Sequence, residues 1–202
     1  MADFEGATID DIYQAFAKAE TGVYSDPWIR TMDKSGLPSD AYGPVQILSS
    51  TMIGATKQKT EEGKPLINFT NEELTFIDRY VEQGRQFYKH GKSKGKIPDY
   101  NPIYDYGGSG DLSEGDKKIY ESTAKKILSY ELKRMKKLGG GIKRLKREWR
   151  FGPPEKWNED DPKFKEYIGK FDTELTRILN ERDTTFLKPD EAVMDTILKG
   201  AR

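Results

Sequence analysis

The chain has 202 residues, 34 basic against 34 acidic side chains, a formal net charge of zero and 35% hydrophobic residues. This size favours one domain with its own core, and the absence of cysteine excludes disulfides and thiolate metal sites. Because His90 is the only histidine, a multi-histidine zinc site and a Ser-His-Asp triad are disfavoured. We therefore expect a polar globule that works without a cofactor.

The N-terminal part of the chain predicts two helices. Apolar residues recur at helical spacing from Ile9 to Ala19, after the N-cap residue Thr8, and Gly22 marks the end of the pattern. A second, shorter helix is predicted from residue 46 to about residue 57.

The middle of the chain predicts a third helix followed by a long loop. Residues 70–73 have the spacing of a capping box and precede a new apolar stripe. Residues 91–110 are rich in Gly, Pro, Lys and Tyr, which is typical of a loop. Loops of this length in compact domains are usually functional or mobile.

The C-terminal half again predicts helices. Ser113 precedes a long amphipathic stretch that ends at three consecutive glycines, residues 139–141, and a short helix is predicted over 142–149. Asp161 and Pro162 are an N-cap followed by proline at the first helical position.

A further helix is predicted to follow Pro162, and a terminal helix over 189–198. No convincing strand pair is present. The sequence therefore predicts an all-α or nearly all-α fold, with one domain over 1–170 and a C-terminal helical extension, 171–202, packed on it.

Glu20 is the strongest candidate for a catalytic residue. It closes the first predicted helix in the segment Glu-Thr-Gly, and about twenty residues later the segment 41–47, AYGPVQI, predicts a tight turn followed by an amide side chain. Partial burial at a helix end would raise the pKa of Glu20 and keep it protonated, as a general acid requires. An ordinary exposed acid is the alternative.

These two segments resemble the lytic transglycosylase group of the lysozyme-like superfamily, whose pattern is Glu-Ser, a loop, and Gly-x-x-Gln. Thr21 stands for the serine here, and Pro44-Val45 replaces the usual Leu-Met. The family's third motif, an aromatic-Asn-x-Gly-Pro element followed by a helix with a tyrosine, is most similar to 149–153 followed by 167–170. Arg150 and Phe151 stand near the place of its asparagine, and 104–108 is a rival segment.

The resemblance implies a lysozyme-like fold and cleavage of the β-1,4 bond between N-acetylmuramic acid and N-acetylglucosamine in peptidoglycan. Glu20 would be the single acid/base, and the product would carry a 1,6-anhydro end. The residues expected to bind the glycan are Thr21, Tyr42, Gly43, Gln46, Tyr104, Tyr106, Trp149 and Phe151. Core packing is the alternative role for Tyr42, Trp149 and Phe151.

The resemblance fits phage members of the group best, so we expect a viral protein, either part of the virion or made for lysis. The expected partners are peptidoglycan glycan strands and other phage virion or lysis proteins. The first residues lack the cationic start and apolar run of a signal peptide, and no stretch approaches the ~20 apolar residues of a membrane span.

Three alternatives remain open on the sequence. A hydrolytic lysozyme would need a second carboxylate to hold water, and Asp33 is the leading candidate. A virion protein could keep the fold without catalysis. A nucleic-acid-binding protein could use residues 117–150, which carry thirteen bases against three acids, although the neutral net charge disfavours it.

Overall fold

The computed structural model describes residues 4, 6–22, 28, 30–32, 38–86 and 113–187, which are mostly helical. The helices are α1 (Ile9–Thr21), α2 (Ser49–Thr56), α3 (Asn71–Gln86), α4 (Glu114–Lys137), α5 (Gly141–Phe151) and α6 (Pro162–Leu187). They are accompanied by the 3-10 turn η2 (Pro154–Lys156) and the short strands β1 (Arg30–Met32) and β2 (Pro38–Tyr42). The predicted all-α class, with minimal β structure, is confirmed.

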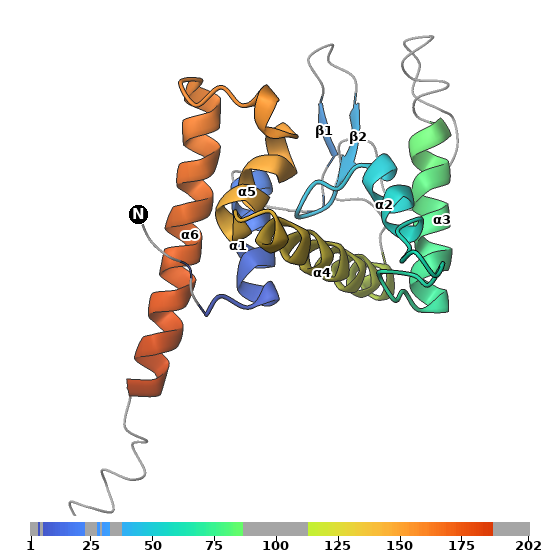
Figure 1. Cartoon of the computed structure of the whole chain (residues 1–202), viewed down its shortest axis with the longest axis horizontal. Coiled ribbons are helices and arrows are strands. Elements are labelled where there is room, and N and C mark those ends of the chain that lie inside the picture. Colours follow the sequence, from blue (N-terminus) through green and yellow to red (C-terminus); the bar gives the residue numbers. More distant parts are fainter. Residues whose placement is uncertain are drawn as a thin grey trace, which may run out of the picture.

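Helix α4 lies in the middle of the fold. Figure 1 shows α1 and α6 on one side of it and α2 and α3 on the other, and α1 packs along α6 as α2 packs along α3. Helix α5 follows α4 after a turn of three glycines and packs back against it. The long central helix therefore links the two halves of the molecule.

The core forms around the apolar face of α4. Its buried side chains follow helical spacing, from Tyr120 through Ile127 and Leu128 to Met135. Phe16 of α1 is also buried and packs against α6 and α5, with ring centroids 4.7 Å from Phe171 and 5.3 Å from Trp149. This aromatic contact joins α1, α5 and α6, and all three helices contribute residues to the candidate site described below.

The start of α1 is tied to α6 by polar contacts. Thr8 and Asp11 form a capping box, in which the Thr8 amide donates to the Asp11 carboxylate at 2.8 Å and the Asp11 amide donates to the Thr8 hydroxyl at 3.2 Å. Arg182 of α6 donates to the same carboxylate at 2.9 Å. Because α1 is held at its N-terminus, Glu20 near its C-terminal end keeps a defined position against α6.

Helix α3 is tied to α4 in a similar way. Glu73, in the capping box predicted at Thr70, accepts from the Thr70 amide at 2.7 Å, from the Ser122 hydroxyl at 2.6 Å and from the Lys126 ammonium at 2.6 Å. These bonds lower the pKa of Glu73 although burial opposes them. The predicted capping box is therefore confirmed, and it also joins two helices.

Two local predictions were wrong. The sequence showed no strand pair, but β1 and β2 form an antiparallel pair in which Arg30 is opposite Tyr42; strands this short carry too little alternation to be recognised. The second helix begins at Ser49 instead of Gln46. Gln46 has a positive φ of 49° and closes a turn on Gly43, which the helix could not accommodate.

Two predictions lie outside the described residues: the loop over 91–110 and the terminal helix over 189–198. Residues 162–187 form one continuous helix, so the described part of the predicted C-terminal extension continues α6. Phe171 and Leu175 of that part are buried in the core.

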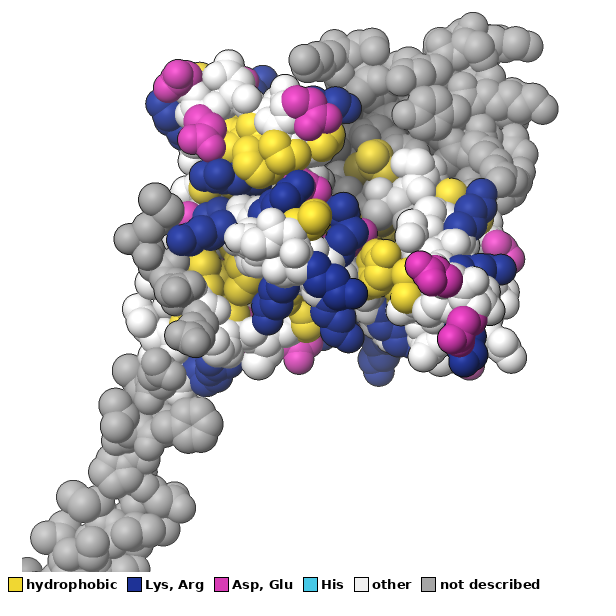
Figure 2. Space-filling view, in the orientation of Figure 1, with side chains coloured by type: hydrophobic (Ala, Val, Ile, Leu, Met, Phe, Trp, Pro, Cys, Tyr) yellow, Lys and Arg dark blue, Asp and Glu magenta, His cyan; other side chains and the backbone are white. Residues whose placement is uncertain are grey.

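Lysine and arginine side chains are prominent on the face that carries α4 and α5 (Figure 2). Most of the bases over 117–150 have acidic partners, however. Eight of the thirteen form ion pairs with acids in the described part of the chain: Lys117, Lys125, Lys126, Arg134, Arg144, Lys146, Arg147 and Arg150. Much of this basic stretch therefore serves internal contacts. Among the described helices, none combines the length and apolar character needed to cross a membrane.

Candidate active site

Glu20 lies at the C-terminal end of α1, where α5 and α6 meet it. Its side chain is only 4% exposed. The Tyr167 hydroxyl of α6 donates to one carboxylate oxygen at 3.0 Å, and the Arg150 guanidinium of α5 donates to the other, also at 3.0 Å. The fold therefore surrounds the predicted catalytic carboxyl with two donors from distant parts of the chain.

The environment of Glu20 gives it a pKa near neutrality. Burial raises the pKa of Glu20 from its ordinary 4.5 to about 7, and the Arg150 charge and the Tyr167 hydrogen bond oppose this rise only in part. Burial and the neighbouring Glu20 carboxylate raise the pKa of Tyr167 well above its usual value, so the phenol remains a donor. A carboxyl with a pKa near 7 can give up a proton and take it back at neutral pH.

Thr21 is buried and fastens the end of α1 to the turn after β2. Its hydroxyl lies 2.9 Å from the Ala17 carbonyl oxygen and 3.3 Å from that of Pro44. At 2% exposure it is covered by the protein. The structure therefore gives Thr21 a positioning role behind Glu20 and no surface for contact with a ligand.

The turn 43–46 places Gln46 in the lining of the same cleft as Glu20. The backbone amide and the side-chain amide of Gln46 both donate to the Gly43 carbonyl, at 3.0 and 2.9 Å. Gly43 has a φ of 76°, and a Cβ atom there would lie 2.6 Å from the Tyr120 ring, so the turn requires glycine. Gln46 lines the cleft described below, whereas Gly43 is not among its lining residues.

Tyr42 belongs to the core. It is fully buried, and the Tyr120 hydroxyl donates to its carbonyl oxygen at 2.7 Å. This is the packing role that the sequence left open for Tyr42. Its contribution to the site is indirect, because it anchors the strand from which the turn 43–46 departs.

Trp149 and Phe151 sit differently, although both are at the end of α5. Trp149 lines the cleft, and its indole N–H donates to the Val45 carbonyl at 3.1 Å. Phe151 instead packs on α6, with ring centroids 4.6 Å from Phe164 and 5.5 Å from Tyr167. Phe151 thus packs against the ring of Tyr167, whose hydroxyl donates a hydrogen bond to Glu20.

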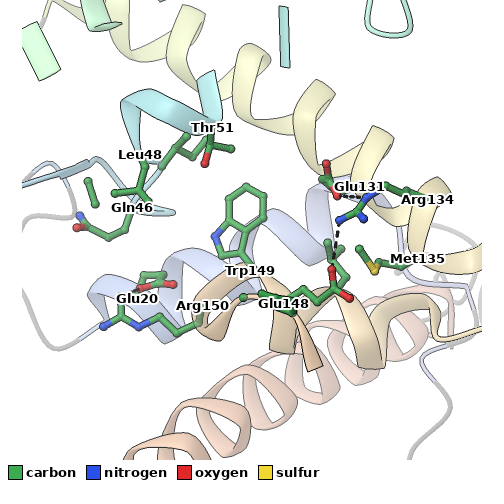
Figure 3. A pocket seen from close by; sticks show the side chains of 15 residues that line it. Glu20, Gln46, Leu48, Thr51, Glu131, Arg134, Met135, Glu148, Trp149 and Arg150 are labelled. Atoms are coloured by element: carbon green, nitrogen blue, oxygen red, sulfur yellow. Dashed lines mark hydrogen bonds and ion pairs between the residues drawn. The ribbon is translucent and has the colours of Figure 1, made fainter. Parts of the chain in front are cut away.

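Glu20 lies at one end of a cleft of about 510 Å³ between the turn after β2, α2, α4 and α5. Figure 3 shows Glu20 and Arg150 at that end, Trp149 in the middle and Arg134 with Glu131 and Glu148 at the other end. The volume is in the range of sites that enclose small-molecule ligands. The cleft therefore extends beyond Glu20 to a second group of charged side chains around Arg134.

The remaining predicted site residues, Asp33, Tyr104 and Tyr106, lie outside the described residues. Within the described part, no group of three or more His, Asp or Glu side chains could hold a metal ion.

Sequence reasoning gave no site role to several residues that the fold brings together. In the sequence, Arg150 and Tyr167 belong only to the segments that resemble the third motif. Glu131, Arg134 and Glu148, at the far end of the cleft, belong to no motif. Arg150 and Tyr167 are 130 and 147 residues from Glu20, so no local pattern links them to it. Comparisons of this chain with protein-family models, with curated proteins and with solved structures find no match.

Proposed function

We propose that this protein is a peptidoglycan lytic transglycosylase that cleaves the bond between N-acetylmuramic acid and N-acetylglucosamine with Glu20 as its single acid/base. The observation that carries the proposal is the Glu20 carboxyl itself. It is nearly fully buried, has a pKa of about 7 and lies at the end of a ligand-sized cleft. An ordinary surface carboxylate is exposed to solvent and keeps a pKa near 4.5, so the combination of burial, raised pKa and cleft position supports a functional role.

In the first step, protonated Glu20 donates its proton to the glycosidic oxygen. The bond from that oxygen to C1 of N-acetylmuramic acid breaks, and the sugar develops positive charge at C1. Because burial keeps the carboxyl protonated up to about pH 7, the acid is available under neutral conditions.

In the second step, the Glu20 carboxylate accepts the proton of the C6 hydroxyl while that oxygen bonds to C1. The 1,6-anhydro ring closes and the enzyme returns to its starting protonation state. Arg150 and Tyr167 both donate to the Glu20 oxygens, so they stabilise the carboxylate that exists between the two steps.

Water is not required in this route, and the described residues favour it over hydrolysis. Besides Glu20, the carboxylates of the described residues that line the cleft are those of Glu131 and Glu148. Both are ion-paired with Arg134, at 2.7 and 3.2 Å, at the opposite end from Glu20 in Figure 3. Neither is placed to hold an attacking water beside Glu20. A hydrolytic enzyme that uses Asp33 is the alternative outcome.

The test is mass spectrometry of the soluble products after purified protein has digested isolated peptidoglycan. Wild-type protein and Glu20→Gln are compared, with Glu174→Gln as a control, because Glu174 pairs with Arg177 on α6 outside the cleft. Products lighter by one water than the hydrated muropeptides, absent only with Glu20→Gln, would support the proposal.

Hydrated reducing ends would instead identify a lysozyme and direct attention to Asp33. No products from any of the three proteins would overturn the enzymatic proposal for this substrate. A non-catalytic virion protein would then be the leading explanation for the fold.

A further inference from the structure

The end of the cleft opposite Glu20 holds an ordered network of charged side chains. The Arg134 Nε donates to Glu131 at 2.7 Å, and its Nη2 donates to Glu148 at 3.2 Å. Glu148 also accepts from the Arg144 Nε at 2.5 Å. The four side chains come from α4 and α5, and Figure 3 shows the bonds of Arg134 within the cleft.

The network stays accessible from the cleft. The Arg134 side chain is 45% exposed and that of Glu131 24%, whereas Glu148 is 12% exposed. A guanidinium has five N–H donors, and the two bonds named above leave donors that a ligand can use. These polar groups are therefore held in place before a ligand arrives, which lowers the ordering cost of binding.

Trp149 lies between this network and Glu20 in the cleft. Its indole is held by the bond to the Val45 carbonyl and by the contact with Phe16. A fixed aromatic ring beside fixed planar donors and acceptors suits a sugar, which has apolar C–H faces and hydroxyl groups around its edge.

The charge balance of the network favours a neutral ligand. Two guanidinium groups face two carboxylates, so their charges cancel and neither a cation nor an anion is selected. Carboxylates can accept from sugar hydroxyls, and a guanidinium can donate to hydroxyl or acetamido oxygens.

We propose that Arg134, Glu131 and Glu148 form a saccharide subsite that binds another sugar of the same glycan strand, on the far side of Trp149 from Glu20. This inference rests on the proposed function. It makes the protein selective for glycans long enough to reach from the scissile bond to Arg134.

One contact of the network has a structural role that the test must separate. The Arg134–Glu148 pair joins α4 to α5, so changes at either residue also affect packing. Glu131 is three residues from Arg134 on the same helical face, and the ion pair between them lies within α4. Glu131→Ala therefore removes a cleft carboxylate without breaking the contact between α4 and α5.

The experiment measures kcat/KM for peptide-free oligosaccharides of alternating N-acetylglucosamine and N-acetylmuramic acid, graded by length. Wild type, Glu131→Ala and Arg134→Met are compared. Glu174→Ala is the matched control, because Glu174 forms an (i,i+3) pair with Arg177 outside the cleft. Thermal melting verifies that each variant is folded.

We expect the ratio of kcat/KM for long chains to that for the shortest cleaved chain to fall about tenfold in Glu131→Ala and Arg134→Met, as for a lost hydrogen bond to a charged group. The ratio should not change in Glu174→Ala. A loss equal at all lengths, or no loss, would overturn the subsite.

Failure of the proposed function has a different signature. If wild-type protein cleaves no oligosaccharide, calorimetry with the same oligosaccharides decides the subsite separately. Binding that weakens in Glu131→Ala and not in Glu174→Ala would retain the subsite without the chemistry. Absence of binding would overturn both.

Discussion

The Tyr167 hydroxyl donates a hydrogen bond to Glu20 at 3.0 Å across a sequence separation of 147 residues. This contact joins the last described helix to the first one. It places a neutral donor against the carboxyl that we propose as the acid/base, and it lowers the pKa of Glu20 relative to burial alone.

Tyr167→Phe should reduce activity and move its pH dependence. The ring and its contact with Phe151 remain, but the carboxylate form of Glu20 loses a donor, so the pKa of Glu20 rises further. A hydrogen bond to a charged group contributes about 1.5–3 kcal/mol, so kcat/KM should fall at least about tenfold, and its loss at high pH should begin at a higher pH. The pH profile of kcat/KM on soluble glycan checks this. An unchanged profile would contradict the role of the hydroxyl.

Glu20 should make the folded state less stable as pH rises. Its pKa is about 7 when folded against an ordinary 4.5, so the folded state binds more protons than the unfolded state between these values, and stability falls over this range. A difference of this size corresponds to about 3 kcal/mol. Glu20→Gln should therefore match wild type near pH 4 and be more stable by up to this amount at pH 8.

Urea denaturation at the two pH values measures this difference. Gln keeps an acceptor oxygen for Tyr167, and the control Glu174→Gln changes an acid whose pKa is lowered, so the control should not gain stability at pH 8. A stability difference between Glu20→Gln and wild type that does not depend on pH would show that Glu20 has an ordinary pKa.

Arg150→Gln should raise the pKa of Glu20, because the guanidinium charge lowers it in the native protein. The side chain of Arg150 is 52% exposed, so solvent screens its charge. We therefore expect that the loss of kcat/KM at high pH moves only modestly to higher pH. Arg150→Lys keeps the positive charge, so the pH at which kcat/KM is lost should stay closer to that of the wild type. A carboxyl-specific NMR titration of Glu20 gives the same information without activity.

Gly43→Ala should destabilise the fold. The position has a positive φ, and the new Cβ would meet the buried Tyr120 ring, so we expect a loss of about 1–3 kcal/mol. Gly169→Ala is the control: Gly169 lies within α6 with nothing near its Cβ position. That change should stabilise by about 0.5–1 kcal/mol. Denaturant unfolding of both variants distinguishes a turn that needs glycine from a general tolerance of alanine.

The parts of the fold that could be predicted from the sequence are those that depend on local residue patterns. The apolar stripe and N-cap of α1, the capping box at Thr70 and the Asp161-Pro162 start of α6 depend on neighbouring residues, and each appears in the structure. Gln46 shows the limit of this reasoning. Its neighbours are apolar and suit a helix, but bonds to the Gly43 carbonyl hold it in a turn, and the space for that turn is set by Tyr120.

The sequence by itself determined the helical class and the position of Glu20 at the end of an amphipathic helix, because helix periodicity and capping act over a few residues. Only the tertiary structure decided the environment of that carboxyl, and with it a pKa near 7. Burial depends on what distant segments cover, and α5 and α6 supply that cover together with Arg150 and Tyr167. The charged network at the far end of the cleft also depends on the tertiary structure, because Glu148 meets Glu131 and Arg134 only when α5 folds back on α4.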